Sequence, residues 1–87
     1  KINLIDVRET FEFEEFNLKG TLIPLGELPS RIDEIEHLKN EEIIVHCRSG
    51  KRSQTAQQFL LQMGFQNVRN LLGGVLDWQS HFRSEPV

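Results

Sequence analysis

Short apolar runs rich in β-branched residues alternate with helical patterns along the chain, and this alternation constrains the fold more than any other feature. The apolar runs are residues 2–7, 20–25, 42–47 and 67–72. The helical patterns that follow them are residues 10–16, 28–40, 53–64 and 75–82. A strand–helix order repeated in this way predicts an α/β fold with a parallel sheet of about four to five strands and helices on both faces.

The helical patterns carry expectations about their ends and inward faces. We expect the helix over 10–16 to start with Thr10 as its N-cap and to turn Phe16 toward the core. We expect the helix over 53–64 to end at Gly64 and to turn Met63 inward. The pattern over 28–40 is the most clearly amphipathic, which predicts a helix with one apolar side.

Length and charge limit the classes of protein to which the chain can belong. With 87 residues it suits one domain, so residues 1–87 are expected to form a single unit. The chain starts at Lys1 inside an apolar run and without an initiator Met, which favours a fragment or the C-terminal domain of a longer protein. A net charge of −3 argues against a nucleic-acid surface, and no apolar run approaches the ~20 residues of a membrane span.

Cys47 is the single cysteine of the chain, and it stands at the end of the strand predicted over 42–47. One cysteine excludes an internal disulfide and a cysteine-based zinc site, and it fits a reducing, cytoplasmic compartment. In parallel α/β sheets the ligand site lies beyond the carboxyl ends of the strands. Cys47 therefore occupies the place where such a site is expected.

The residues after Cys47, with the sequence RSGKR, are too polar to continue the strand and form the turn into the next helix. Backbone N–H groups in such a turn can converge on one point, and Gly50 eases the tight curl. The positive end of the following helix and three cations, Arg48, Lys51 and Arg52, add to the attraction for an anion. Helix N-termini and basic neighbours lower the pKa of cysteine, so we predict that the Cys47 thiol is largely ionised at neutral pH.

Simpler interpretations of single residues stand beside this one. A lone cysteine is often a buried structural residue, although three neighbouring cations disfavour that interpretation here. His46 should point to the opposite side of the strand from Cys47, which favours a core histidine over a general base. The carboxylates of EFEE at 12–15 fit a solvated helix face. His37 and His81 lie on predicted helices, and no metal site is expected at either.

Four stretches together resemble the rhodanese family of sulfurtransferases, and they follow the family's order over nearly the whole chain. They are LIDVRETFEFE at 4–14, NLKGTLIPLGEL at 17–28, IVHCRSGKRSQTA at 44–56 and LLGGVLDW at 71–78. The third stretch resembles the family's active-site strand, loop and helix. The resemblance implies a rhodanese-like fold, an enzyme of the thiosulfate or persulfide sulfurtransferase type, and no cofactor.

The resemblance also implies roles for individual residues. Cys47 would attack a sulfane sulfur donor, carry the outer sulfur as a persulfide and pass it to a thiol, cyanide or a sulfur-carrier protein. The substrate-binding loop would consist of Arg48, Ser49, Gly50, Lys51 and Arg52. Asp6 and Arg8 match the family's DVR motif and would support the loop or border the site. Gly73, Gly74 and Trp78 would be structural.

Two departures from the family pattern point to a subgroup. Asn17 stands where the family usually has histidine, and GTLIPL at 20–25 is one residue shorter than the common pattern. Such variants resemble rhodanese domains fused to adenylating enzymes of molybdopterin and thiamine biosynthesis. The partners implied are a donor such as thiosulfate or a cysteine desulfurase, and a ubiquitin-like sulfur-carrier protein as acceptor.

Two other functions compete with sulfur transfer. Cysteine phosphatases and arsenate reductases use a similar loop, but theirs has five residues between cysteine and arginine, whereas Arg52 follows Cys47 after four. The resulting six-residue loop matches the rhodanese count. The second rival is a non-catalytic rhodanese-like interaction module, although such modules often lack the cysteine that this chain retains.

Overall fold

The computed structural model describes residues 2–71 and 73–75, and within this range the order of elements follows the predicted alternation. The strands are β1 (Asn3–Asp6), β2 (Thr21–Leu22), β3 (Glu42–His46) and β4 (Asn67–Asn70). The α-helices are α1 (Thr10–Glu15) and α2 (Lys51–Gln62). Two 3₁₀ helices, η1 (Leu25–Glu27) and η2 (Pro29–Leu38), connect β2 to β3. The helix expected over 75–82, with Trp78, lies outside the described residues beyond Val75.

The strands form one parallel sheet in the order β2-β1-β3-β4, which confirms the predicted α/β fold. Asp6 pairs in register with His46, and Val45 pairs with Asn70. The ends of β1, β3 and β4 therefore meet at the same edge of the sheet. Because Cys47 follows β3 directly, the residues at the ends of β1 and β4 become its neighbours.

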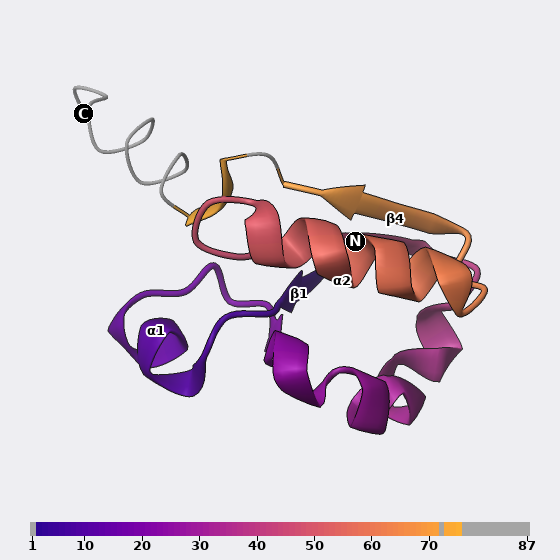
Figure 1. Cartoon of the computed structure of the whole chain (residues 1–87), viewed down its shortest axis with the longest axis horizontal. Helices are drawn as coiled ribbons and strands as arrows, with labels where there is room; N and C mark the ends of the chain where they lie inside the picture. Colours follow the sequence, from indigo (N-terminus) through magenta and orange to yellow (C-terminus); the bar gives the residue numbers. More distant parts are fainter. Residues whose placement is uncertain (1, 72, 76–87) are drawn as a thin grey trace.

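The core lies between the sheet and the helices on one of its faces. Ile5, Ile43 and Val45 lie on one face of the sheet and belong to this core, where Ala56 and Leu60 of α2 are also fully buried. Figure 1 shows α2 alongside β4, with the 3₁₀ helices below it in the view. Burying each of the larger aliphatic side chains stabilises the fold by about 1.5–3 kcal/mol, and α2 is thereby held with its N-terminus at the end of β3.

The ends of α1 differ from the prediction. Glu9, not Thr10, is the N-cap, because Glu9 and Glu12 form a reciprocal capping box that satisfies N–H groups at the start of the helix. α1 ends at Glu15, so Phe16 has extended backbone and remains 37% exposed instead of entering the core. The predictions for Thr10 and Phe16 were therefore wrong.

The second half of the chain also departs from the predicted boundaries. α2 begins at Lys51, two residues earlier than expected, and ends before Met63, whose 44% exposed side chain contradicts the inward prediction. The segment predicted as a helix over 28–40 is a 3₁₀ helix that is interrupted at Arg31, where the backbone angles are not helical. Ile35 is nevertheless buried, so the predicted apolar side is present. Among the described residues, no helix has the length and apolar character needed to cross a membrane.

Candidate active site

The sulfur of Cys47 lies at the focus of backbone N–H groups between β3 and α2. The N–H of Gly50 donates to Sγ over 3.1 Å, and the N–H of Ser53 donates over 3.3 Å. Gly50 has a φ of 103°, a left-handed conformation that side chains rarely adopt, and it forms the N-cap of α2. The predicted curl of the loop, with Gly50 as the residue that permits it, is confirmed.

These hydrogen bonds decide the acidity of the thiol. Burial raises the pKa of the Cys47 thiol, but hydrogen bonds from the Ser53 side chain and from the backbone of Ser53, Gly50 and Ser49 lower it further than burial raises it. The pKa therefore lies below its ordinary value. The direction agrees with the sequence prediction, although donors within the loop and at the start of α2 contribute more than the neighbouring cations on which the prediction relied.

Sequence reasoning did not identify Ser53 as a neighbour of the sulfur, nor Asn70 as a neighbour of Ser53. The hydroxyl of Ser53 lies 3.5 Å from Cys47 Sγ, and it also forms a short contact with Oδ1 of Asn70. The side-chain amide of Asn70 in turn donates to the carbonyl of Gly50 over 3.1 Å. Ser53 belongs to the helical pattern and Asn70 to a strand, so nothing in the sequence shows that they meet.

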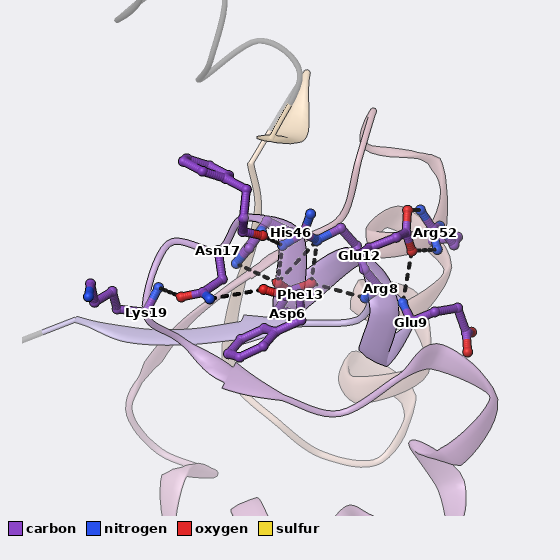
Figure 2. A network of polar contacts seen from close by, with 10 residues as sticks. Asp6, Arg8, Glu9, Glu12, Phe13, Asn17, Lys19, His46 and Arg52 are labelled. Carbon is purple, nitrogen blue, oxygen red and sulfur yellow. Dashed lines mark hydrogen bonds and ion pairs between the residues drawn. The ribbon is translucent and has the colours of Figure 1, made fainter.

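The loop cations have two different surroundings. Arg48 and Lys51 are exposed at the surface. Arg52 instead donates from both terminal guanidinium nitrogens to the carboxylate of Glu12 on α1, over 2.8 and 2.9 Å (Figure 2). This pair lowers the pKa of Glu12 to about 2, chiefly through the hydrogen bond from Arg52. Glu12 therefore supports the loop. The expectation that it belongs to a solvated helix face was wrong.

Asp6 and Arg8 form a buried ion pair beside the site, with 2.8 Å between Arg8 Nη2 and Asp6 Oδ2 (Figure 2). Arg8 also donates to the carbonyl of Phe16, which ties the end of β1 to the segment after α1. His46 lies 4.0 Å from Asp6 on the side of β3 away from Cys47. Neither Asp6 nor Arg8 has a hydrogen bond to residues 47–52 in the described part of the chain, so any support that they give to the loop is indirect.

Gly74 lets the segment after β4 pack directly on the loop backbone. A Cβ at this position would come within 2.7 Å of the Arg48 carbonyl oxygen and still closer to that of Cys47. The N–H of Val75 donates to the carbonyl of Cys47 over 2.8 Å. This segment therefore fixes the peptide of Cys47, as the structural role expected for Gly74 implies.

A groove of about 620 Å³ opens beside the loop, while Cys47 itself is only 1% exposed. Its lining is polar and basic: Ser49, Gly50, Lys51, Gln54, Gln57, Val68, Arg69, Asn70 and Gly73. The groove is bordered by α2 on one side and β4 on the other. Among the described residues, no group of three or more His, Cys, Asp or Glu side chains is arranged to hold a metal ion.

The fold, the loop and the sequence agree with one known family. The family model for a rhodanese-like domain matches residues 1–81. The chain belongs to the rhodanese-like family. This rhodanese-like domain is 40% identical over 78 residues to the "Putative sulfur carrier protein YrkF" of Bacillus subtilis, a match that covers 88% of the chain and 41% of the relative.

Two further matches cover a larger share of the protein to which this domain is similar. A sulfurtransferase of Allochromatium vinosum is 35% identical over 79 residues, covering 90% of the rhodanese-like domain and 72% of the relative. The solved structure of a rhodanese with anions from E. coli aligns with a TM-score of 0.79 and 33% identity, covering 88% of the domain and 91% of that chain. These matches confirm the fold and connect the domain with sulfur transfer.

Proposed function

We propose that this domain is a sulfurtransferase in which Cys47 carries a sulfane sulfur as a persulfide. The observation that carries the proposal is the position of Cys47 Sγ, which receives N–H hydrogen bonds from Gly50 and Ser53 at the start of α2. These donors favour a sulfur with negative charge, and the thiolate is the form of cysteine that attacks. The matches to sulfurtransferases support the same chemistry.

The proposed reaction has two steps. In the first, the Cys47 thiolate attacks the outer sulfur of a donor such as thiosulfate; a new S–S bond forms, and sulfite leaves with the electron pair of the broken bond. In the second, an acceptor nucleophile attacks the outer sulfur of the persulfide. The bond between the two sulfurs breaks, and its electron pair returns to Cys47 as a thiolate. Neither step requires a cofactor.

The loop supplies groups suited to an anionic donor. Arg48 and Lys51 are exposed cations, and the backbone of Ser49 and Gly50 lies beside Cys47. We propose that these residues, with Arg52 held by Glu12, bind the donor, and that Asp6 and Arg8 support the end of β1. Thiosulfate and the persulfide of a cysteine desulfurase are the donor classes that fit this proposal.

The acceptor is proposed to be a small nucleophile such as a thiol or cyanide, or a sulfur-carrier protein whose C-terminus an adenylating enzyme has first activated. In the second case the outer sulfur of the persulfide attacks the acyl carbon, adenylate leaves, and a thiol reductant cleaves the resulting acyl disulfide to release the thiocarboxylate. The groove beside the loop is suited to an extended tail, because the exposed cation Lys51 lines it together with polar side chains, whereas Arg69, which also lines it, is ion-paired with Glu42 over 2.6 Å. The Bacillus subtilis relative is named for a sulfur carrier, which favours this acceptor class. Fusion to an adenylating domain and a reducing, cytoplasmic location belong to the same proposal.

Intact mass spectrometry tests the first step directly. The protein is incubated with thiosulfate, or with a cysteine desulfurase and cysteine, and its mass is measured before and after addition of cyanide. We expect a gain of one sulfur atom that cyanide removes as thiocyanate, and no gain in Cys47→Ser. No mass gain from either donor in correctly folded protein would refute the proposal.

The near-complete burial of Cys47, which is 1% exposed, is the observation that favours a second candidate. In that candidate the domain is a non-catalytic interaction module, and Cys47 is a structural residue. The same experiment separates the two functions. A structural cysteine takes up no sulfur, and the Cys47→Ser variant then retains every cellular activity of the protein.

A further inference from the structure

The hydroxyl of Ser53 has one proton but three acceptors within reach. These are the carbonyl of Gly50 at 3.1 Å, the Sγ of Cys47 at 3.5 Å, and Oδ1 of Asn70, which is the shortest contact. A serine hydroxyl donates a single hydrogen bond at a time. The three contacts therefore cannot all be hydrogen bonds donated by Ser53 at the same time, and the hydroxyl donates to one of the three acceptors.

Two other donors already occupy the carbonyl of Gly50. The N–H of Gln54 donates to it over 3.0 Å in the first turn of α2, and the amide nitrogen of Asn70 donates over 3.1 Å. A carbonyl oxygen has two lone pairs, so its capacity is filled without Ser53. The effective choice for the Ser53 proton is between Asn70 Oδ1 and Cys47 Sγ.

We propose that the Ser53 proton alternates between these two acceptors during sulfur transfer, which makes Ser53 and Asn70 a hydroxyl switch for the Cys47 sulfur. When Sγ carries a full negative charge as a thiolate, it attracts the proton more strongly than a neutral amide oxygen does. When Sγ is bonded to a second sulfur in the persulfide, the charge lies on the outer sulfur, and the proton returns to Asn70. The inference rests on the proposed function.

The switch acts mainly on the step that releases sulfur. When cyanide attacks the outer sulfur, thiocyanate forms and the electron pair of the S–S bond passes to Cys47 Sγ. Negative charge therefore develops on Sγ as the transition state is reached, and the Ser53 proton moves to stabilise it. Ser53 touches the reacting atom, whereas Asn70 is a positioning residue that holds the hydroxyl in place while Sγ is neutral.

The surrounding charges stay the same when either residue of the switch is replaced, so a change in the pKa of Cys47 does not come from a lost charge. The charged and titratable groups around the loop are Arg48, Lys51, Arg52 with Glu12, and, across β3, His46 with Asp6 and Arg8. Ser53→Ala and Asn70→Ala alter none of them. Thr55→Ala removes another hydroxyl of α2, which is exposed and bonded within the helix, and serves as the matched control.

The first test measures the rate of alkylation of Cys47 by iodoacetamide as a function of pH. We expect Ser53→Ala to raise the pKa of Cys47 by about one unit, because a hydrogen bond to the charged sulfur is lost. We expect Asn70→Ala to lower it by less than one unit, because Oδ1 no longer competes for the proton, while the Gly50 carbonyl, which loses the Asn70 donor, is a neutral acceptor that attracts the proton less than the charged sulfur does. We expect Thr55→Ala to leave it unchanged. A raised pKa in both Ser53→Ala and Asn70→Ala would overturn the switch; if Asn70→Ala fails to fold, Asn70→Leu fills its volume and answers the same question.

The second test follows the two half-reactions separately by rapid quenching and mass spectrometry. Ser53→Ala should slow release of sulfur to cyanide about ten-fold at every pH, a loss equal to one pKa unit. Loading from thiosulfate should reach the wild-type rate once the pH exceeds the pKa of the variant. Equal slowing of both half-reactions, or of neither, would overturn the proposal. If the wild-type protein takes up no sulfur, the proposed function fails, yet the alkylation profiles still decide whether the proton is shared.

Discussion

Arg52, in the loop at Cys47, is paired with Glu12 on α1, forty residues earlier in the chain. The two side chains make parallel hydrogen bonds of 2.8 and 2.9 Å, the geometry in which an arginine–carboxylate pair is strongest. The charge of one loop cation is therefore matched by a carboxylate. The pair also ties the short helix α1 to the candidate active site.

Replacing Glu12 with Gln should lower stability in a way that depends on pH. Gln keeps an acceptor for the capping box but loses the ion pair, which is worth about 0.5–1 kcal/mol for a partly exposed pair. Because the pKa of Glu12 is lowered to about 2 in the folded protein, the stabilisation is fully present above the unfolded value of about 4.3 and is lost as the pH falls toward 2.

Urea unfolding of the wild type and of Glu12→Gln at several pH values checks this expectation. The difference in unfolding free energy should be constant from pH 7 to about pH 5 and vanish near pH 2. Glu14→Gln, an exposed change on the same helix, is the control. A difference that persists unchanged at pH 2 would show that the ion pair is not its source.

The exposed loop cations should govern binding of an anionic donor. Removing Arg48 or Lys51 by substitution with Ala is expected to raise KM for thiosulfate several-fold, with a smaller effect on kcat, because the charge acts before the chemical step. The effect should shrink as salt is added, since exposed charges are screened within about 8–10 Å. Steady-state kinetics at two ionic strengths measure the rise in KM and its dependence on salt.

Lys19→Asn is the matched control for the loop cations. It removes a positive charge elsewhere, at a residue with a φ of 66° where Asn is well tolerated. Its KM should equal that of the wild type. If Lys19→Asn raises KM as much as Arg48→Ala does, the protein's overall charge is responsible and the loop cations have no special role.

Gly74→Ala should be strongly destabilising. The new Cβ would meet the carbonyl oxygens of Cys47 and Arg48, and the φ of 57° is one that Ala adopts at a cost. We expect a loss of about 2–4 kcal/mol in thermal or urea unfolding. Gly26→Ala is the control, because a Cβ there meets nothing within 4 Å, and it should stay within about 0.5 kcal/mol of the wild type.

His46→Leu should not destabilise the protein at neutral pH. His46 is fully buried, and neither ring nitrogen has a hydrogen-bond partner among the described residues, so an apolar side chain of similar size removes an unsatisfied group. Burial lowers the pKa of His46, with an opposing effect from Asp6 and a further lowering effect from Arg8. The neutral ring is therefore the form that the folded protein keeps.

Measuring the unfolding free energy as a function of pH tests whether His46 is buried in its neutral form. In the wild type, stability is lost below the unfolded histidine pKa of about 6.5, where the unfolded chain takes up a proton that the buried ring does not. His46→Leu removes that loss, whereas His37→Gln, at an exposed histidine, does not. A variant more than about 1 kcal/mol less stable than the wild type at pH 7 would show that the ring is hydrogen-bonded.

The sequence predicted the sheet and the location of Cys47 because both depend on local patterns. The run EIIVH can only be a buried strand in an acidic, polar chain, and the polar residues after Cys47 must leave it. Gly50 was recognised for the same reason, since a tight turn requires a residue that accepts a positive φ. Two errors fell at element ends, where Phe16 and Met63 follow the helical pattern but lie beyond the last turn. A third lies inside the segment predicted as one helix over 28–40, which is a 3₁₀ helix interrupted at Arg31.

The contacts of Glu12, Ser53 and Asn70 could not be predicted in this way. Each residue fits an ordinary local role: a capping carboxylate, a helix residue and a strand end. They reach the loop because parallel strands end at one edge of the sheet and because the Glu12–Arg52 ion pair joins α1 to the first turn of α2. These contacts join residues 17 and 40 positions apart in the sequence.

The amino-acid sequence by itself determined the order of strands and helices, the parallel sheet and the cysteine at the end of β3. Apolar periodicity and turn-forming residues act over a few positions, and they are visible in a single chain. Only the tertiary structure decided which groups surround the sulfur, which cation of the loop is paired with a carboxylate, and which hydroxyl lies beside the sulfur. Those facts depend on distances between segments remote in sequence, and such distances are fixed by packing of the core.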